Sequence, residues 1–152
     1  MHAHRPPAGI TLIELLVALL VAGILSALTV PGFTAYLQRE RVAGALNRLT
    51  GELYHAQMLA VRNGARYQLR FVPAAGCARS YEVVRAEEDA VVRTVDVARE
   101  AAGVCLESNV THAFSFDSRG LLLGSARTVF ARSGAQRDSL VISMVGRVYR
   151  IR

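Results

Sequence analysis

The sequence predicts an α+β protein in which a long N-terminal helix packs on a C-terminal antiparallel β-sheet domain. Three observations support this class. An apolar stretch lies near the N-terminus, the next segment has apolar residues at helical spacing, and the period shortens to that of strands after Gly64. A length of 152 residues leaves room for one globular domain and little more.

Composition excludes several classes of protein. Hydrophobic residues make up 52% of the chain, which is too many for an intrinsically disordered protein. The two Cys residues are too few for a disulfide-rich scaffold. A single apolar stretch is long enough to cross a bilayer, which excludes a multispan membrane protein.

The apolar stretch covers residues 10–30 and contains one charged residue, Glu14. As a helix rising 1.5 Å per residue it is about 30 Å long, which matches the hydrocarbon core of a bilayer. Arg5 makes the preceding segment positive, so we expect a cytoplasmic N-terminus and an exported C-terminal part.

Two simpler readings of this stretch explain less. A secretory signal peptide would end in a cleavage site of small residues, and Ala27-Leu28-Thr29 is a poor match to one. A plain membrane anchor leaves Glu14 unexplained, because a carboxylate in an apolar span costs a few kcal/mol on insertion scales.

The start of the stretch carries a specific pattern. Gly9 is followed by Ile10-Thr11-Leu12-Ile13-Glu14-Leu15-Leu16 and then by Pro31, which resembles the N-terminus of type IV pilins and type II secretion pseudopilins. In that family a prepilin peptidase cuts after the glycine and N-methylates the new first residue. The resemblance implies a leader of residues 1–9, cleavage between Gly9 and Ile10, and methylation of Ile10, where the family usually has Phe. Glu14 becomes the fifth mature residue and Pro31 the twenty-second, where the family's helix commonly bends or melts.

Glu14 has a physical reason to lie in such a span. Cleavage would leave a positive amine on Ile10, and Glu14 of one chain would pair with that amine on a neighbour in a filament. A paired carboxylate is tolerated in apolar surroundings where a lone one is not. We therefore expect Glu14 to set the register between assembled subunits.

Residues 31–64 are predicted to form an amphipathic continuation of the helix. Its apolar face has i, i+3, i+4 spacing and comprises Val42, Ala45, Leu46, Leu49, Leu53, Ala56, Leu59 and Ala60. The charged residues are expected on other faces: Arg39, Arg41, Arg48, Glu52 and Arg62. Tyr54 and Met58 are expected in the core, and His55 in packing or at the surface. Asn63-Gly64 is a helix stop signal.

Residues 65–152 are predicted to form six or seven short strands of an antiparallel sheet packed on the helix. The strands are centred on 67–71, 81–83, 91–97, 114–116, 128–130, 140–142 and 148–151. Residues 114–120, with the sequence FSFDSRG, resemble a turn of the GspH/FimT group of minor pilins. A strand over 138–144 followed by Gly146-Arg147 resembles the end of FimT-like proteins, whereas residues 65–110 carry no motif that we can name.

The two cysteines, Cys77 and Cys105, lie 28 residues apart. In an oxidising periplasm they form either a disulfide, which would contribute about 3 kcal/mol, or two separate buried thiols. We expect no metal and no cofactor, because His55 and His112 are the only histidines after cleavage and no CxxC or HxxxH pattern occurs. Nucleophile-elbow, phosphate-loop and dinucleotide-binding motifs are also absent, so we expect no catalytic residues and no enzyme.

Charge is distributed unevenly along the chain. Residues 39–79 carry a net +5, residues 80–118 a net −5, and residues 119–152 a net +6. The chain ends in Gly146-Arg147-Val148-Tyr149-Arg150-Ile151-Arg152, and an extended strand would place Arg150 beside Arg152, with Arg147 nearby at the turn. Some FimT-like pilins have a Gly-Arg-x-Arg end that binds DNA; here the second Arg is displaced by one residue.

Three interpretations of these arginines remain open. They form a solvated edge strand that discourages aggregation, they contact the acidic residues 80–118 of a neighbouring subunit, or they bind DNA phosphates.

Taken together, the sequence is identified as a GspH/FimT-type minor pilin or pseudopilin. The expected parts are a leader (1–9), a transmembrane helix segment (10–30), an amphipathic periplasmic helix (31–64) and a β-rich domain (65–152). The expected location is the bacterial inner membrane, with one pass and the C-terminal domain in the periplasm, and then a pilus or pseudopilus. Expected partners are other pilin or pseudopilin subunits and prepilin peptidase. The expected function is type II secretion or type IV pilus assembly, which the N-terminal pattern does not separate, with DNA uptake as the alternative.

Overall fold

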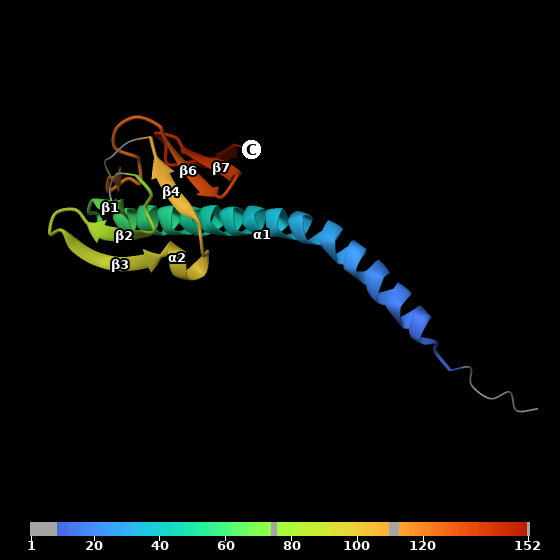
Figure 1. Cartoon of the computed structure of the whole chain (residues 1–152). Coiled ribbons are helices and arrows are strands. Elements are labelled where there is room, and N and C mark those ends of the chain that lie inside the picture. Colours follow the sequence, from blue (N-terminus) through green and yellow to red (C-terminus); the bar gives the residue numbers. More distant parts are fainter. Residues whose placement is uncertain (1–8, 74–75, 110–112, 152) are drawn as a thin grey trace, which may run out of the picture. The chain divides into compact units, whose positions relative to one another are not determined.

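The computed structural model describes residues 9–73, 76–109 and 113–151, with backbone alone for residues 28–31. It contains one long helix, α1 (Leu12–Asn63), one short helix, α2 (Val97–Glu100), and two four-stranded antiparallel sheets (Figure 1). The chain divides into two compact units, Met1–Tyr36 and Leu37–Arg152. The α+β class predicted from the sequence is confirmed.

The described part of the first unit is helical from Leu12 onward. Thr11 caps this helix, because its Oγ1 accepts a hydrogen bond from the backbone N–H of Glu14 at 3.3 Å. Large apolar side chains follow and are exposed, among them Leu12, Ile13, Leu16 and Leu20. Within the described residues, α1 is the one helix long and apolar enough to cross a membrane.

Pro31 is assigned helical backbone within α1. A proline lacks the N–H that would donate to the carbonyl four residues earlier, so the helix carries one hydrogen bond fewer at this point. The helix is therefore not melted at the position where the family resemblance allows melting.

The C-terminal half of α1 packs its predicted apolar face into the core of the second unit. Val42, Leu46, Leu49, Leu53, Ala56 and Ala60 are buried, and Leu59 packs against them. Asn63 ends the helix, and Gly64 takes a left-handed conformation, with φ +60°. The periodicity thus located most of the buried face, and the Asn63-Gly64 stop signal located the end of the helix.

Three expectations for this helix were wrong. Glu52 was expected on a solvent-facing side and is 6% exposed. Tyr54 and Met58 were expected in the core, yet they are 43% and 70% exposed. At 100° per residue, positions 54 and 58 lie to one side of the stripe that contains Leu53 and Ala56, whereas position 52 lies at its other border.

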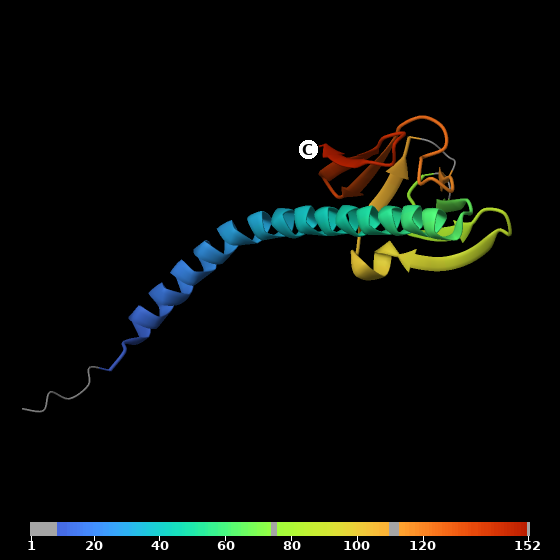
Figure 2. The same cartoon turned by 180° about the vertical axis from the view of Figure 1, so that it is seen from behind.

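The strands form two sheets rather than the single sheet that was expected. The first has the order β3 (Ala90–Asp96), β2 (Ser80–Arg85), β1 (Tyr67–Val72), β5 (Phe114–Phe116). The second has the order β4 (Cys105–Ser108), β6 (Arg127–Ser133), β7 (Gln136–Ile142), β8 (Val148–Ile151). In Figures 1 and 2, β2, β3 and α2 are drawn below the C-terminal half of α1, and β6 and β7 above it.

Two elements in the region without a recognisable motif were not predicted. Strand β4 has no alternating pattern, and it forms because it pairs along its whole length with β6. Helix α2 begins at Asp96, whose side chain accepts a hydrogen bond from the backbone N–H of Arg99 at 3.2 Å. Strand β7 ends at Ile142 instead of residue 144, because a turn closed by Gly146 N–H donating to the Ser143 carbonyl follows it.

A single core joins α1 to both sheets. It contains Leu69 and Tyr81 from the first sheet and Val129 and Leu140 from the second. Phe114 packs edge-on against Phe71, with 5.7 Å between ring centroids. Both sheets therefore present one face to this core and leave the other available for contacts with other molecules.

Candidate functional sites in the N-terminal helix and the C-terminal sheets

The predicted processing site lies just before the helix. Gly9 and Ile10 are exposed and precede Thr11, the residue that caps α1. A peptidase needs an extended, accessible peptide bond, and the bond between Gly9 and Ile10 lies outside helical structure. Cleavage and methylation at this bond remain predictions.

Glu14 occupies the third position of the helix, after the Thr11 cap. The Thr-x-x-Glu spacing is that of a capping box, and a carboxylate in the first turn also interacts favourably with the helix dipole. No side chain in the described part of the chain forms an ion pair with Glu14. Pairing of Glu14 with the Ile10 amine of a neighbouring subunit stays a prediction.

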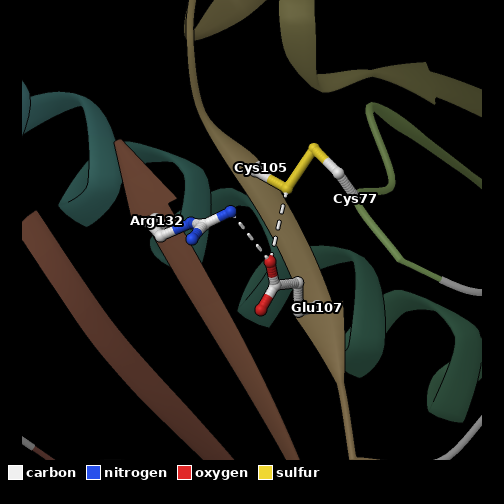
Figure 3. Close-up of a disulfide and its surroundings, with 4 residues drawn as sticks. All are labelled: Cys77, Cys105, Glu107 and Arg132. Carbon is white, nitrogen blue, oxygen red and sulfur yellow. Dashed lines mark hydrogen bonds and ion pairs between the residues drawn. A yellow bond between two sulfur atoms is a disulfide. The ribbon is translucent and has the colours of Figure 1, made fainter. Parts of the chain in front are cut away.

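Cys77 and Cys105 form a disulfide with a Cα–Cα distance of 5.2 Å (Figure 3). The bond ties the segment between β1 and β2 of the first sheet to β4 of the second. Beside it, Ala78 and Leu106 exchange backbone hydrogen bonds of 2.9 and 3.0 Å. The Glu107 carboxylate lies 3.8 Å from the Cys105 sulfur and 3.3 Å from Arg132. The disulfide therefore fixes the two sheets to each other.

The arginines of the C-terminal strand do not form one cluster. Arg150 shares the inner side of β8 with Val148, which packs on the core, and donates from Nε to Asp138 at 2.7 Å. Arg147 lies just before β8 and is exposed, and the alternation of side chains carried back from Val148 assigns it to the other side. Arg152 lies outside the described residues. DNA binding by Arg147, Arg150 and Arg152 stays a prediction.

Most carboxylates of the acidic region between residues 80 and 118 have an arginine partner within the chain. Seven of its eight carboxylates pair with an arginine at 2.8–3.8 Å: Glu82, Glu87, Glu88, Asp89, Glu100, Glu107 and Asp117. The eighth, Asp96, caps α2. Arg70 and Arg85 each pair with two of these carboxylates, so the pairing does not cancel every negative charge, and a contact with the arginines of a neighbouring subunit stays open.

Glu52 is a buried carboxylate that sequence analysis placed at the surface. It lies 3.5 Å from Arg48, 3.3 Å from Arg93 and 3.9 Å from the His55 ring nitrogen. Burial, together with the Glu52 charge, raises the pKa of the neighbouring Tyr81 hydroxyl. The i, i+4 spacing of Arg48 and Glu52 was a signal for an ion pair, whereas the contact with Arg93 depends on the fold.

The two glycines of the GspH/FimT-like segments meet at one side chain of α1. Gln57 donates from Nε2 to the Gly120 carbonyl at 2.7 Å. A Cβ on Gly146 would collide with the same Nε2 and would lie 2.9 Å from the Gly120 carbonyl oxygen. Both glycines also have positive φ, near +78°. Gly120, which follows β5, and Gly146, in the turn between β7 and β8, thus both lie against Gln57 of α1.

Comparison with known families and proteins identifies the N-terminal segment. Residues 5–30 match the prokaryotic N-terminal methylation motif. The chain is 34% identical over 116 residues to the type IV major pilin protein PilA of Myxococcus xanthus, an alignment that covers 72% of this chain. The chain spans about half the length of that relative, 52%.

Solved structures show the same fold. The type IV minor pilin FimU of Pseudomonas aeruginosa superposes with a TM-score of 0.64 at 19% identity, covering 77% of this chain and 92% of FimU. The minor pseudopilin EpsH from the type 2 secretion system of Vibrio cholerae gives a TM-score of 0.54 at 11% identity, covering 75% of this chain and 96% of EpsH. These similar proteins are structural subunits rather than enzymes. Within the described residues, no cluster of three His, Cys, Asp or Glu side chains has an arrangement that would hold a metal.

Proposed function

We propose that this chain, a pilin-class protein by its N-terminal motif and its fold, is a minor subunit of a type II secretion pseudopilus or a type IV pilus. In that role it supports assembly of the filament and, in the first case, protein secretion. The observation that carries the proposal is one helix that joins a methylation motif and an exposed apolar stretch to a small domain with a pilin fold.

The exposed apolar stretch explains why such a subunit assembles. Large side chains such as Leu12, Leu16 and Leu20 are exposed, and each needs lipid or another protein around it. Lipid covers them in the inner membrane, and neighbouring subunits cover them in a filament. Glu14 then pairs with the Ile10 amine of a neighbour, after prepilin peptidase has removed residues 1–9.

We further propose that residues 10–30 cross the membrane once, with residues 31–64 and the β-rich domain of residues 65–152 in the periplasm. Arg5 before the span supports a cytoplasmic N-terminus. The Cys77–Cys105 disulfide supports an oxidising compartment for the domain. A cysteine-accessibility assay on intact and permeabilised cells would test this orientation.

Deletion of the gene in its own host tests the filament type. If the chain belongs to a type IV pilus, it co-purifies with pili sheared from cells, and deletion reduces piliation. If it belongs to a secretion pseudopilus, deletion lowers the amount of secreted protein and leaves piliation unchanged. Normal piliation together with normal secretion in the deletion strain would contradict the proposal.

A second candidate function is DNA uptake, in which the chain is a DNA-binding minor pilin. The net +6 of residues 119–152 favours it, and neither Arg137 nor Arg147 of this segment forms an ion pair with any residue that the structure describes. The test is DNA binding by the full chain in detergent micelles at increasing salt concentrations, beside an Arg147/Arg150/Arg152→Gln variant. Each lost phosphate contact lowers the log–log salt slope by nearly one unit for duplex DNA. Weak binding by the unmodified chain would remove this candidate and leave the structural role.

A further inference from the structure

We propose that the outer face of the second sheet is a binding surface for single-stranded nucleic acid. The outer face is defined by Phe130, Arg132, Arg137, Arg147, Tyr149 and Ile151. The inference deepens the second candidate function and rests on it, but it moves the binding surface from the inner Arg150 to the opposite side of the sheet.

Burial along the strands defines which side chains belong to this face. Val129, Ala131, Leu140 and Ile142 are buried in the core. Side chains alternate between the two sides of a strand, so the residues between them lie on the other side. Tyr149 and Ile151 are 49% and 55% exposed there. The surface is thus a sheet face with large exposed side chains that nothing in the described part of the chain covers.

The register places basic residues at both ends of the face and apolar groups between them. Arg132 pairs with Arg137 at the end near the β6–β7 turn. Tyr149 pairs with Val141, and Ile151 with Ser139, which in turn pairs with Phe130. Arg147 accepts a backbone hydrogen bond from Ser143 at the far end. The distance along β7 from position 137 to position 143 is about 20 Å, from six steps of about 3.4 Å.

The charge on this face is positive and largely free. Its one nearby carboxylate, Glu107, is paired with Arg132 at 3.3 Å. Neither Arg137 nor Arg147 forms an ion pair with any residue that the structure describes. Arg147 uses its backbone N–H, not its guanidinium, to reach the Ser143 hydroxyl at 3.1 Å. Two guanidinium groups are therefore available for an anionic partner.

The aromatic groups indicate what kind of anion fits. The Arg137 guanidinium lies over the Phe130 ring, 4.2 Å from its centroid, and offers a flat cationic platform. Tyr149 offers an exposed ring on the neighbouring part of the face. Bases that are not stacked in a duplex pack on such rings and guanidinium planes, while the phosphates contact arginine. A sheet face with aromatic and Arg side chains therefore favours a single strand over a duplex or an acidic protein.

The test measures binding of a fluorescein-labelled oligo-dT to the full chain in detergent micelles by anisotropy, across a range of salt concentrations. We expect Arg137→Gln and Arg147→Gln each to lower the salt slope by about 0.7, the value for a phosphate contact on a single strand. Tyr149→Ala is expected to weaken binding by about tenfold with an unchanged slope, because the ring stacks without carrying charge.

The matched control is the double variant Asp138→Asn/Arg150→Gln, which neutralises an ion pair on the inner side of the same strands. It should leave both affinity and slope unchanged. Circular dichroism and thermal unfolding of every variant show whether the fold is kept.

Each other outcome overturns the inference in a different way. In one outcome, the chain binds oligo-dT with a steep salt dependence, the control variant abolishes this binding, and the outer-face variants do not. The inner side would then bind DNA, so the DNA-uptake candidate would survive without this inference. If poly-glutamate competes as well as oligo-dT, the face recognises acidic protein instead. If the unmodified chain does not bind oligo-dT, both the inference and the DNA-uptake candidate fail, and the filament role is unaffected.

Discussion

Both Nε and Nη2 of Arg150 donate to the same carboxylate oxygen of Asp138, at 2.7 and 2.5 Å, between the adjacent strands β7 and β8. The two side chains are 29% and 14% exposed. Arg150, for which sequence analysis left a solvated edge strand, a subunit contact and DNA binding open, therefore has a partner inside the fold. Its removal leaves a partly buried carboxylate without a charge partner.

We predict that Arg150→Gln lowers the free energy of unfolding by about 1 kcal/mol, the usual size for a charge-assisted hydrogen bond of limited burial. Urea unfolding of the full chain in detergent measures this change in the free energy of unfolding. The Asp138→Asn change, alone and combined with Arg150→Gln, completes a double-mutant cycle. Purely additive effects in this cycle would show that the pair does not stabilise the strand.

Gly146 is predicted to be the glycine least tolerant of a side chain. In Gly146→Ala the Cβ would meet the Gly120 carbonyl at 2.9 Å, and its φ of +77° is strained for alanine. We expect a loss of about 2 kcal/mol in the free energy of unfolding. Gly51→Ala is the control, because Gly51 lies within α1 with no atom within 4 Å of a new Cβ. Gly51→Ala should raise the free energy of unfolding by about 0.5–1 kcal/mol. An equal effect of Gly146→Ala and Gly51→Ala on this free energy would refute the steric argument.

Asp117 is predicted to contribute to acid sensitivity. The backbone N–H of Leu121, then that of Arg119 and the Arg119 guanidinium, hold the pKa of the Asp117 carboxyl below its usual value. The folded pKa is below the unfolded value of about 3.9, so the stabilisation is present above that pH and is lost as the pH falls through the folded pKa. Unfolding free energies measured between about pH 6 and pH 2 should therefore decline less steeply in Asp117→Asn than in the unmodified chain. Identical pH profiles would rule out this carboxyl as a source of the decline.

Reduction of the Cys77–Cys105 disulfide is predicted to destabilise the second unit by about 3 kcal/mol, because the bond closes a loop of 28 residues in the unfolded chain. Thermal unfolding with and without a thiol reductant measures the change. A Cys77→Ala/Cys105→Ala variant should match the reduced chain and show no response to the reductant. An unchanged melting temperature after complete reduction would contradict the prediction.

Two substitutions separate the two roles of Glu14. Glu14→Gln keeps an acceptor at the third position of the helix and removes the charge, whereas Glu14→Ala removes both. If the residue pairs with a neighbour's Ile10 amine, both variants should be incorporated into filaments at well below the level of the unmodified chain. The measurement is the amount of the chain in filaments sheared from cells. Normal incorporation of Glu14→Gln alone would reduce the role of Glu14 to local helix capping.

Local patterns in the sequence determined the class of this protein. The motif from Gly9 to Glu14 consists of adjacent residues, so it can be recognised without knowledge of the fold. The apolar periodicity of α1 determined its buried face, because a helix repeats at a fixed angle per residue. Alternation located most strands, since each β-branched or aromatic residue on one face points to the core.

The tertiary structure decided what the charged residues do. Glu52 is buried because Arg93 of β3 reaches it, and Arg150 is paired because β7 brings Asp138 beside it. Strand β4 formed for the same reason, since its hydrogen-bond partners are on β6. These ion pairs and strand pairings join residues that are distant in sequence. The two residues of each pair become neighbours only when the chain folds. Composition along the chain gave the sum of the charges, whereas the fold decided which of them remain free to bind another molecule.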